Sequence, residues 1–325
     1  MIKAQLDRQR DPNQQIDNPV VFLAGALRSG TTLLRLMLDG HSKIRCPGEF
    51  DFIADSRHEL GPNATVEQHW DNLERKRIFR DYGFTKPNAS NYHDFVRNLI
   101  AQISEPGETV VLPIHRRFEY LQEIVPNSRF IHLVRDPRDV AYSVIAMGWA
   151  GNVWHGSECW LGTETSWKHT SGSIAADAQT MVRFEDLVRE PEKTLGHLCE
   201  FMGFEFDPGM LQVDDRSTYK PPSGTFAHKW QKKKNEREIE LIEHRSRPLM
   251  EEFGYKPVSQ PISRPGSLTL LGLRIQDKFA RLRFNSQRYS FKTIALEKLS
   301  RWFKCNGLHD RIQRQMDQTE SQHLK

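Results

Sequence analysis

The stretch PVVFLAGALRSGTTLLRLML, residues 19–38, constrains the fold more than any other segment. Its first part, up to Ala24, is short, continuous and apolar, which is typical of a buried strand. After Gly30, apolar residues recur at helical spacing: Leu33, Leu34, Met37 and Leu38. Because Gly25 and Gly30 have the spacing of the phosphate-binding motif G-x-x-x-x-G-K-[ST], the sequence predicts a strand, a phosphate loop and a helix.

One residue departs from that motif, because Thr31 stands where the motif has lysine. In nucleoside triphosphatases this lysine reaches the β and γ phosphates, and the next hydroxyl holds magnesium. Backbone N–H groups and the helix dipole still point to one spot, and nearby side chains add donors. These side chains are Arg28, Ser29, Thr31 and Thr32. We therefore expect an anion here that needs neither the lysine nor magnesium.

A second strand, loop and helix are predicted in RFIHLVRDPRDVAYSVIAMG, residues 129–148. Pro137 suits a first helical turn, where its missing N–H is not needed. Arg135 ends the strand, on the side where open α/β sheets bind ligands, and Ser143 lies about two turns into the helix. Alternatively, Arg135 forms a surface ion pair with Asp136 or Asp139. The two units predict an α/β fold, three-layer α/β/α with a doubly wound, parallel central sheet.

Charge divides the chain unevenly. Residues 258–325 carry 13 Lys/Arg and 5 Asp/Glu, whereas residues 1–257 carry 33 and 37. Three prolines within residues 256–267 mark a boundary. We expect a polar N-terminal arm at 1–17, the α/β domain at 18–257 and a basic helical extension at 258–325.

Several features bear on location and metal content. No run of about 18 apolar residues offers a transmembrane segment, and the polar N-terminus lacks the apolar core of a secretory signal. The four cysteines show no C-x-x-C pairing. We expect a cytoplasmic protein without a metal site or a disulfide framework.

The two loop segments together resemble the signature loops of the sulfotransferases that use 3′-phosphoadenosine-5′-phosphosulfate (PAPS). Similarity at residues 182–204 and 247–255 extends the resemblance over roughly residues 18–257. It implies a PAPS-dependent sulfotransferase with a P-loop-like fold that releases 3′-phosphoadenosine-5′-phosphate (PAP) and needs no metal. Protein-tyrosine sulfotransferases look closest, and bacterial relatives of broader specificity share a P-G-E segment.

The resemblance also assigns roles to residues. By match to the family, the 5′ end of the cofactor would contact Arg28, Ser29, Gly30, Thr31 and Thr32. Arg135 and Ser143 would hold the 3′-phosphate. The acceptor would be a hydroxyl or amine of a small molecule, a carbohydrate or a tyrosyl peptide, and no nucleic-acid partner is expected.

Sulfuryl transfer needs positioned cations and a base. The resemblance assigns the base to Glu49, with an offset of one residue in the alignment, and Arg28 would offset developing charge. Glu49 can also be a helix cap or an ion-pair partner of Arg45.

By the same resemblance, relatives often carry a lysine on the strand before the second motif, at the position where this chain has Val111. His115 or Arg116 could supply the missing positive charge, and His115 is an alternative base. A histidine without a role at a strand end is the other interpretation.

Further candidates follow along the chain. Ser217, in an Arg-Ser-Thr segment, resembles a serine that contacts the bridging region of the cofactor, or it is a plain loop serine. Trp230 lies in a segment that resembles a loop closing over the cofactor. The tryptophans of residues 148–169 line an acceptor pocket or fill the core.

The basic tail has apolar residues at helical spacing. It packs on the domain or on a second subunit, giving a homodimer, or it makes peripheral contact with an anionic membrane. Two alternatives to the enzyme remain: a non-catalytic PAPS- or PAP-binding protein, and a P-loop kinase-like phosphotransferase.

Overall fold

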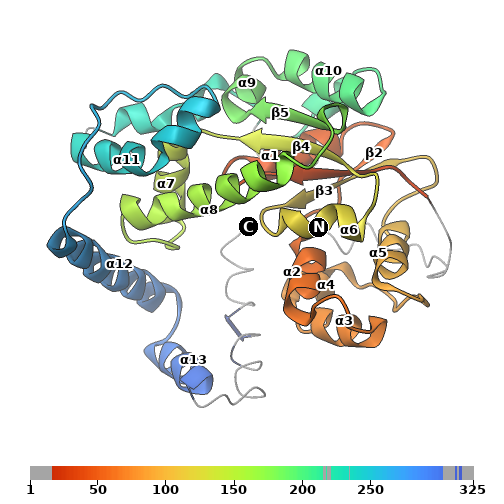
Figure 1. Ribbon diagram of the computed structural model, residues 1–325, viewed down its shortest axis with the longest axis horizontal. Helices are drawn as coiled ribbons and strands as arrows, with labels where there is room; N and C mark the ends of the chain where they lie inside the picture. Colours follow the sequence, from red (N-terminus) through yellow and green to blue (C-terminus); the bar gives the residue numbers. More distant parts are fainter. Residues whose placement is uncertain are drawn as a thin grey trace.

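A parallel five-stranded sheet lies at the centre of the computed structural model, which describes residues 17–214, 217, 221–233, 235–302, 312, 315 and 316 (Figure 1). The strand order is β2-β3-β1-β4-β5, and every pairing between neighbours is parallel. The strands are β1 (Val20–Ala24), β2 (Ile44–Arg45), β3 (Thr109–Ile114), β4 (Arg129–Val134) and β5 (Gln179–Arg183).

Side chains along the central strand alternate between the two faces of the sheet, as the twofold period of a strand requires. Phe22 belongs to the apolar cluster on one face and Leu23 to the cluster on the other. Both are fully buried, so β1 is covered on both sides. A strand buried on both faces must be apolar throughout, which explains the run VVFLA.

Helices cover both faces and give three layers (Figure 1). One face packs against α1 (Thr31–Leu38), α9 (Phe184–Arg189) and α10 (Pro191–Met202). The opposite face packs against a larger group of helices. These are α2 (Asp51–Leu60), α3 (Val66–Leu73), α4 (Arg77–Tyr82), α5 (Tyr92–Ala101), α6 (Leu121–Ile124) and α8 (Val153–Ser171).

Two helices begin where the sequence predicts them. Helix α1 follows Gly30, whose φ of 97° lies in the left-handed region that favours glycine. Helix α7 (Pro137–Ala146) begins with Pro137 in its first turn, and the carboxylate of Asp136 accepts a hydrogen bond from the Arg138 N–H as the N-cap. Both loops therefore lie at the carboxyl ends of adjacent strands, β1 and β4.

Beyond the sheet, α11 (Glu236–Glu252) packs on α7 and α8. The proline-containing stretch leads to α12 (Ser267–Arg288) and α13 (Phe291–Trp302), which lie at the periphery in Figure 1. The predicted three-layer α/β/α fold with a parallel sheet is confirmed. Residues 1–16 of the expected arm, and residues 303–325 of the extension except 312, 315 and 316, lie outside the described residues. Among the helices described, none combines the length and apolarity needed to span a bilayer.

Candidate functional site

The loop between β1 and α1 is built around two glycines. A Cβ on Gly25 would lie 2.5 Å from the Leu133 carbonyl oxygen, and one on Gly30 would lie 2.3 Å from the Phe184 ring. Because neither position has room for a side chain, the loop packs directly on β4 and α9. Helix α1 has no side-chain N-cap, so the N–H groups of its first turn, which includes Thr31 and Thr32, remain available to an anion.

Ser29 is the clearest sign that the loop holds a ligand. Its side chain is fully buried, yet its Oγ has no hydrogen-bond partner among the described residues. A buried hydroxyl without a partner costs roughly 1–3 kcal/mol. Arg28, beside it, has a φ of 73°, a left-handed conformation that is uncommon for a residue other than glycine. Strained backbone and an unsatisfied hydroxyl together suit a site that a phosphate or sulfate completes.

The second loop brings its candidates to the same place. Arg28 Nε donates to Ser143 Oγ across 3.1 Å, and Arg135 Nη1 donates to the Arg28 carbonyl oxygen across 3.1 Å. Residues predicted for the two ends of the cofactor therefore lie next to one another. Two guanidinium groups and a hydroxyl thus lie together at the carboxyl ends of β1 and β4, the edge at which doubly wound sheets bind ligands.

Arg135 is held on three sides. Its guanidinium carbon lies 4.3 Å from the centre of the Phe184 ring, Nη2 donates to the Phe226 carbonyl oxygen across 3.1 Å, and Nη2 lies 3.5 Å from Asp139. The ion pair expected as an alternative is thus present, with Asp139 and not Asp136. The Nε of Arg135 is buried and has no partner among the described residues, which leaves one donor for a ligand.

Asp139 also fixes the segment that carries Trp230. Its carboxylate accepts the backbone N–H of Trp230 at 2.7 Å and that of Lys229 at 3.3 Å. Burial raises the pKa of Asp139 and outweighs the opposing effects of Arg135 and these hydrogen bonds. The Trp230 ring packs 3.7 Å from the guanidinium carbon of Arg138. The backbone and ring contacts of Trp230 therefore attach residues 226–230 to the second loop and α7.

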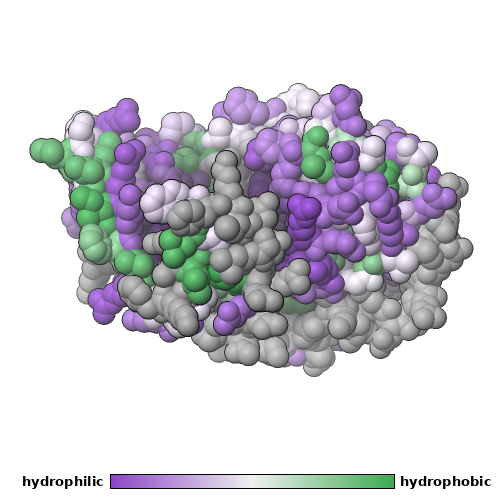
Figure 2. All heavy atoms as spheres, turned by 90° about the horizontal axis from the view of Figure 1, so that it is seen from below, coloured by the Kyte–Doolittle hydropathy of each residue, from purple (hydrophilic) through white to green (hydrophobic). Residues whose placement is uncertain are grey.

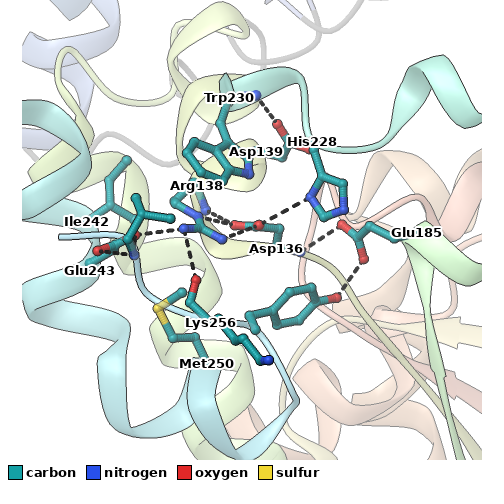
Figure 3. Close-up of polar contacts among 12 residues, drawn as sticks. Asp136, Arg138, Asp139, Glu185, His228, Trp230, Ile242, Glu243, Met250 and Lys256 are labelled. Atoms are coloured by element: carbon teal, nitrogen blue, oxygen red, sulfur yellow. Dashed lines mark hydrogen bonds and ion pairs between the residues drawn. The ribbon is translucent and has the colours of Figure 1, made fainter. Parts of the chain in front are cut away.

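A buried ionic network connects the second loop to α11 and to Glu185 of α9 (Figure 3). Arg138 Nη2 lies 2.7 Å from Asp136, and its Nη1 lies 2.7 Å from Glu243 of α11. Glu185 accepts the Asp136 N–H at 3.1 Å and the Tyr255 hydroxyl at 2.7 Å. All five residues are buried. The network sets the direction of the turn between β4 and α7, and hence the position of Arg135.

His115 forms a second buried site next to the phosphate loop. Its Nδ1 lies 2.8 Å from Asp51 Oδ2, its backbone N–H donates to Asp51 Oδ1 at 2.8 Å, and its Nε2 lies 3.2 Å from Thr31 Oγ1. Burial disfavours the imidazolium, but the charge and hydrogen bond of Asp51 outweigh it and raise the pKa of His115. For Asp51, His115 likewise overcomes burial and lowers the pKa. The pair therefore favours a positively charged imidazole against the loop.

Two further predictions concern the surroundings of His115: Glu49 as the base, and the position of the absent strand lysine. Glu49 is exposed between β2 and α2, and its negative charge adds to the effects that raise the pKa of His115. Arg45 donates to the Ile103 carbonyl oxygen and lies 3.8 Å from Asp39, so the structure records other partners for it than Glu49. Val111 is buried in β3, and the Arg116 side chain pairs with Asp55.

The remaining candidates divide between core and surface. Ser217 Oγ donates to the Val213 carbonyl oxygen within its own segment, and its neighbours Arg216 and Thr218 lie outside the described residues. Trp160 and Trp167 are buried core residues, whereas Trp149 is 44% exposed and its ring centre lies 5.9 Å from the Arg28 guanidinium carbon. Only Trp149 of these lies beside the phosphate loop as an exposed ring.

Two residues at this site were not expected from the sequence. Asp51 opens α2, and its only sequence signal is its place two residues after Glu49 in the P-G-E-F-D run. Phe184 supports both Gly30 and Arg135; it lies in the segment 182–204 that resembles the family, but no pattern there predicted this role.

Comparisons with known proteins identify the family of the chain. A family model described as "Sulfotransferase family" matches residues 19–208, more than half of the chain. The chain is 27% identical over 289 residues to protein-tyrosine sulfotransferase 1 of Danio rerio, covering 78% of each. It is 26% identical over 221 residues to the protein-tyrosine sulfotransferase of Drosophila melanogaster, and the match covers 64% of this chain but only 43% of that relative.

Solved structures agree on the fold. A sulfotransferase domain from the curacin biosynthetic pathway aligns with a TM-score of 0.57 at 19% identity, covering 74% of this chain and 99% of that one. The sulfotransferase domain of the Synechococcus PCC 7002 olefin synthase aligns with a TM-score of 0.55 at 24% identity, covering 77% and 99%.

Proposed function

Because this chain belongs to the sulfotransferase family, we propose that it transfers a sulfuryl group from PAPS to an acceptor hydroxyl. The observation that carries the proposal is the pairing of Arg28 with Ser143, which joins the two anion-binding loops into one region. A donor with phosphate groups at both its 5′ and 3′ positions needs such a region. The absence of the Walker lysine agrees with this donor, because PAPS has no γ phosphate for that lysine to bind.

When bound, PAPS supplies an activated sulfuryl group on a phosphate leaving group. The residues that would hold its 5′ end are Arg28, Ser29, Gly30, Thr31 and Thr32, through the orphaned Ser29 hydroxyl and the N–H groups of α1. Arg135 and Ser143 would hold the 3′-phosphate through the free Nε of Arg135 and the Ser143 hydroxyl. The residues present therefore fit the cofactor.

Glu49 is the proposed general base. Its exposed carboxylate stands at the carboxyl end of β2, where an acceptor hydroxyl can approach from solvent. His115 suits a different role, because its ring is buried and Asp51 favours its protonated form. The imidazolium, 3.2 Å from Thr31, supplies the positive charge that the strand lysine gives in relatives. Val111 is then no obstacle to catalysis.

A tyrosyl peptide is the acceptor to test first, because the relatives named above are protein-tyrosine sulfotransferases. A phenol also makes the smallest demand on the base, since its pKa is about 10. The exposed ring of Trp149 near Arg28 offers an apolar surface on which an aromatic acceptor can pack.

The test is transfer of labelled sulfate from PAPS to a tyrosyl peptide, a small phenol, an alcohol and an amine. Binding is measured separately as thermal stabilisation by PAP without magnesium, with ATP and magnesium as the control. PAP at 100 times its dissociation constant should add about 2.7 kcal/mol. Stabilisation by PAP without transfer to any acceptor would indicate a non-catalytic binding protein. Equal stabilisation by ATP with magnesium would indicate a phosphotransferase.

A further inference from the structure

Helix α12 is attached to the domain by one face. Asp277 accepts the Gly151 N–H at 2.7 Å, and Asn152 donates to the Leu273 carbonyl oxygen at 2.7 Å. The Phe284 ring packs against Gly148 so closely that a Cβ there would clash with it. These contacts hold α12 on residues 148–152, the segment that also carries Trp149 beside Arg28.

The opposite face of α12 is apolar and exposed to solvent. Its residues follow one another at offsets of three or four, which places them on one side of a helix. Leu268 is 85% exposed and Phe279 is 69% exposed. The complete row is Leu268, Leu271, Ile275, Phe279 and Leu282. Ile275 and the attached Asp277 are two residues apart, about half a helical turn, so the two faces point in opposite directions.

Basic side chains border this exposed row. Arg274, Lys278 and Arg281 recur at offsets of four and three along one flank, and all three are exposed. The whole helix carries five basic residues and one acidic residue, Asp277. Asp277 is buried against Gly151 and lies 3.6 Å from Arg281 Nη1, so the one carboxylate of α12 lies on its attached side.

The molecular surface has the same arrangement. In Figure 2, the view from below, a band of apolar atoms runs along the left edge, where α12 lies in Figure 1, beside a band of hydrophilic atoms. An apolar row next to a cationic flank matches the boundary of an anionic bilayer, where acyl chains lie beneath negative headgroups.

We propose that the exposed face of α12 binds the surface of an anionic lipid bilayer, with Leu271, Ile275 and Phe279 in the headgroup boundary. Charge complementarity decides between this and a second copy of the chain. A bilayer of anionic lipids neutralises Arg274 and Lys278 and adds negative charge beside Arg281, which also pairs with Asp277. A second α12 offers no exposed carboxylate to these residues and brings like charges together. Binding would place residues 148–152 near the membrane.

The experiment is co-sedimentation of the full chain with vesicles of phosphatidylcholine alone and of phosphatidylcholine mixed with phosphatidylglycerol. We expect binding to the anionic vesicles, little to the neutral ones, and loss of binding at high salt, because screening weakens attraction between exposed charges. If the wild-type protein does not sediment with the anionic vesicles, the proposal is wrong.

Two sets of variants separate the apolar row from the basic flank. Ile275→Ser with Phe279→Ser should lower the bound fraction at least tenfold, and Met181→Ser, a similar change at an exposed residue of β5, should not. Arg274→Gln, Lys278→Gln and Arg281→Gln together should remove the preference for anionic lipid. The matched control is Lys43→Gln, Arg75→Gln and Lys193→Gln, three exposed cations outside α12.

Molar mass in solution provides the remaining outcome. It is measured by light scattering for wild type and for the Ile275/Phe279 variant, together with the melting temperature. A monomer whose variants melt like wild type but lose vesicle binding supports the membrane surface. A wild-type dimer that the variant dissociates, without vesicle binding, overturns it and assigns the face to a second copy. If the apolar variant does not fold, the charge variants decide the question alone.

Discussion

Arg28 Nε donates a hydrogen bond to Ser143 Oγ across 3.1 Å, although 115 residues separate them in the chain. The contact exists because β1 and β4 are neighbours in the sheet, so the loops that follow them meet at one edge. Arg28 therefore touches both loops, and its position depends on both. In the proposed function, contacts with the 5′ end of the cofactor would therefore be coupled through Arg28 to contacts with its 3′ end.

Removing Arg135 should weaken a nucleotide with a 3′-phosphate much more than one without it. Arg135→Ala should weaken the binding free energy of PAP by about 1.5–3 kcal/mol, the usual contribution of a charge-assisted hydrogen bond. The affinity for adenosine 5′-phosphate should stay nearly unchanged. Titration calorimetry with both nucleotides measures the difference. Arg183→Ala is the control, since Arg183 ends the neighbouring strand β5 and pairs with Asp186. Equal losses for both nucleotides would place Arg135 away from the 3′-phosphate.

Glu49→Gln should separate binding from catalysis. The change keeps the shape and removes the proton acceptor, so turnover should fall by about 10²–10⁴ while PAP affinity is retained. An alcohol acceptor should lose more than a phenol, because its proton is harder to remove. Rates are compared under conditions where chemistry is limiting, with Glu74→Gln as an exposed control. Retention of more than about a tenth of wild-type turnover on an alcohol would assign the base elsewhere.

His115 should give the enzyme an alkaline limit. Asp51 raises the pKa of His115, so the imidazolium is lost only as pH rises through this raised value, and turnover should fall there. His115→Lys should keep activity beyond that limit, because lysine stays charged to a pH of about 10. His115→Gln should be slow throughout and lack the limit. A pH profile of kcat for the three proteins is the measurement, and an alkaline limb unchanged in the lysine variant would contradict the role.

The free energy of unfolding should depend on pH through His115 and Asp51, in the directions set by their pKa shifts. The contribution of His115 is complete below about 6.5, its unfolded pKa, and is lost as pH rises through its raised folded value. The contribution of Asp51 is present above about 3.9 and is lost as pH falls through its lowered folded value. Denaturant melts of wild type and Asp51→Asn across this range should therefore differ most between the two limits.

Arg138 should matter for stability rather than for ligand charge. Arg138→Ala removes the nearest cation from buried Asp136 and Glu243, which keep only the more distant His228 at 3.7 Å and Arg247 at 3.9 Å, and should cost about 3–5 kcal/mol. Arg237→Ala breaks an exposed pair with Glu240 on α11 and should cost about 0–1 kcal/mol. Midpoints of denaturant unfolding compare the two. Similar midpoints would mean that the network in Figure 3 adds little to stability.

The local parts of the site were predictable and the long-range parts were not. The phosphate loop and the start of α7 follow from glycine spacing and from Pro137, because such signals act within a few residues. The pairing of His115 with Asp51 spans 64 residues and that with Thr31 spans 84, so no short pattern encodes either. Arg138 stands in the second motif, yet its ion pair depends on Glu243, 105 residues later.

Burial of the tryptophans shows the same limit. Helical spacing alone could not tell a pocket from a core, and in the structure Trp160 is fully buried whereas Trp149 stays exposed. The difference arises because Trp160 faces α11 and the second loop, where its Nε1 donates to the Arg135 carbonyl oxygen at 2.9 Å. Trp149 precedes α8, so the accessible ring is set by how residues 148–152 and α8 each pack in the folded chain.

The strand order also has a consequence for synthesis of the chain on the ribosome. Strand β1 has β3 and β4 as its two neighbours, and Val20 pairs with Val110 while Val21 pairs with Arg129. The phosphate loop therefore cannot take shape until both later strands have been translated. Until then the apolar run VVFLA has no partner and is open to aggregation or chaperone capture. Expression yield should accordingly respond to slow translation between residues 25 and 134, the stretch from the end of β1 to the end of β4.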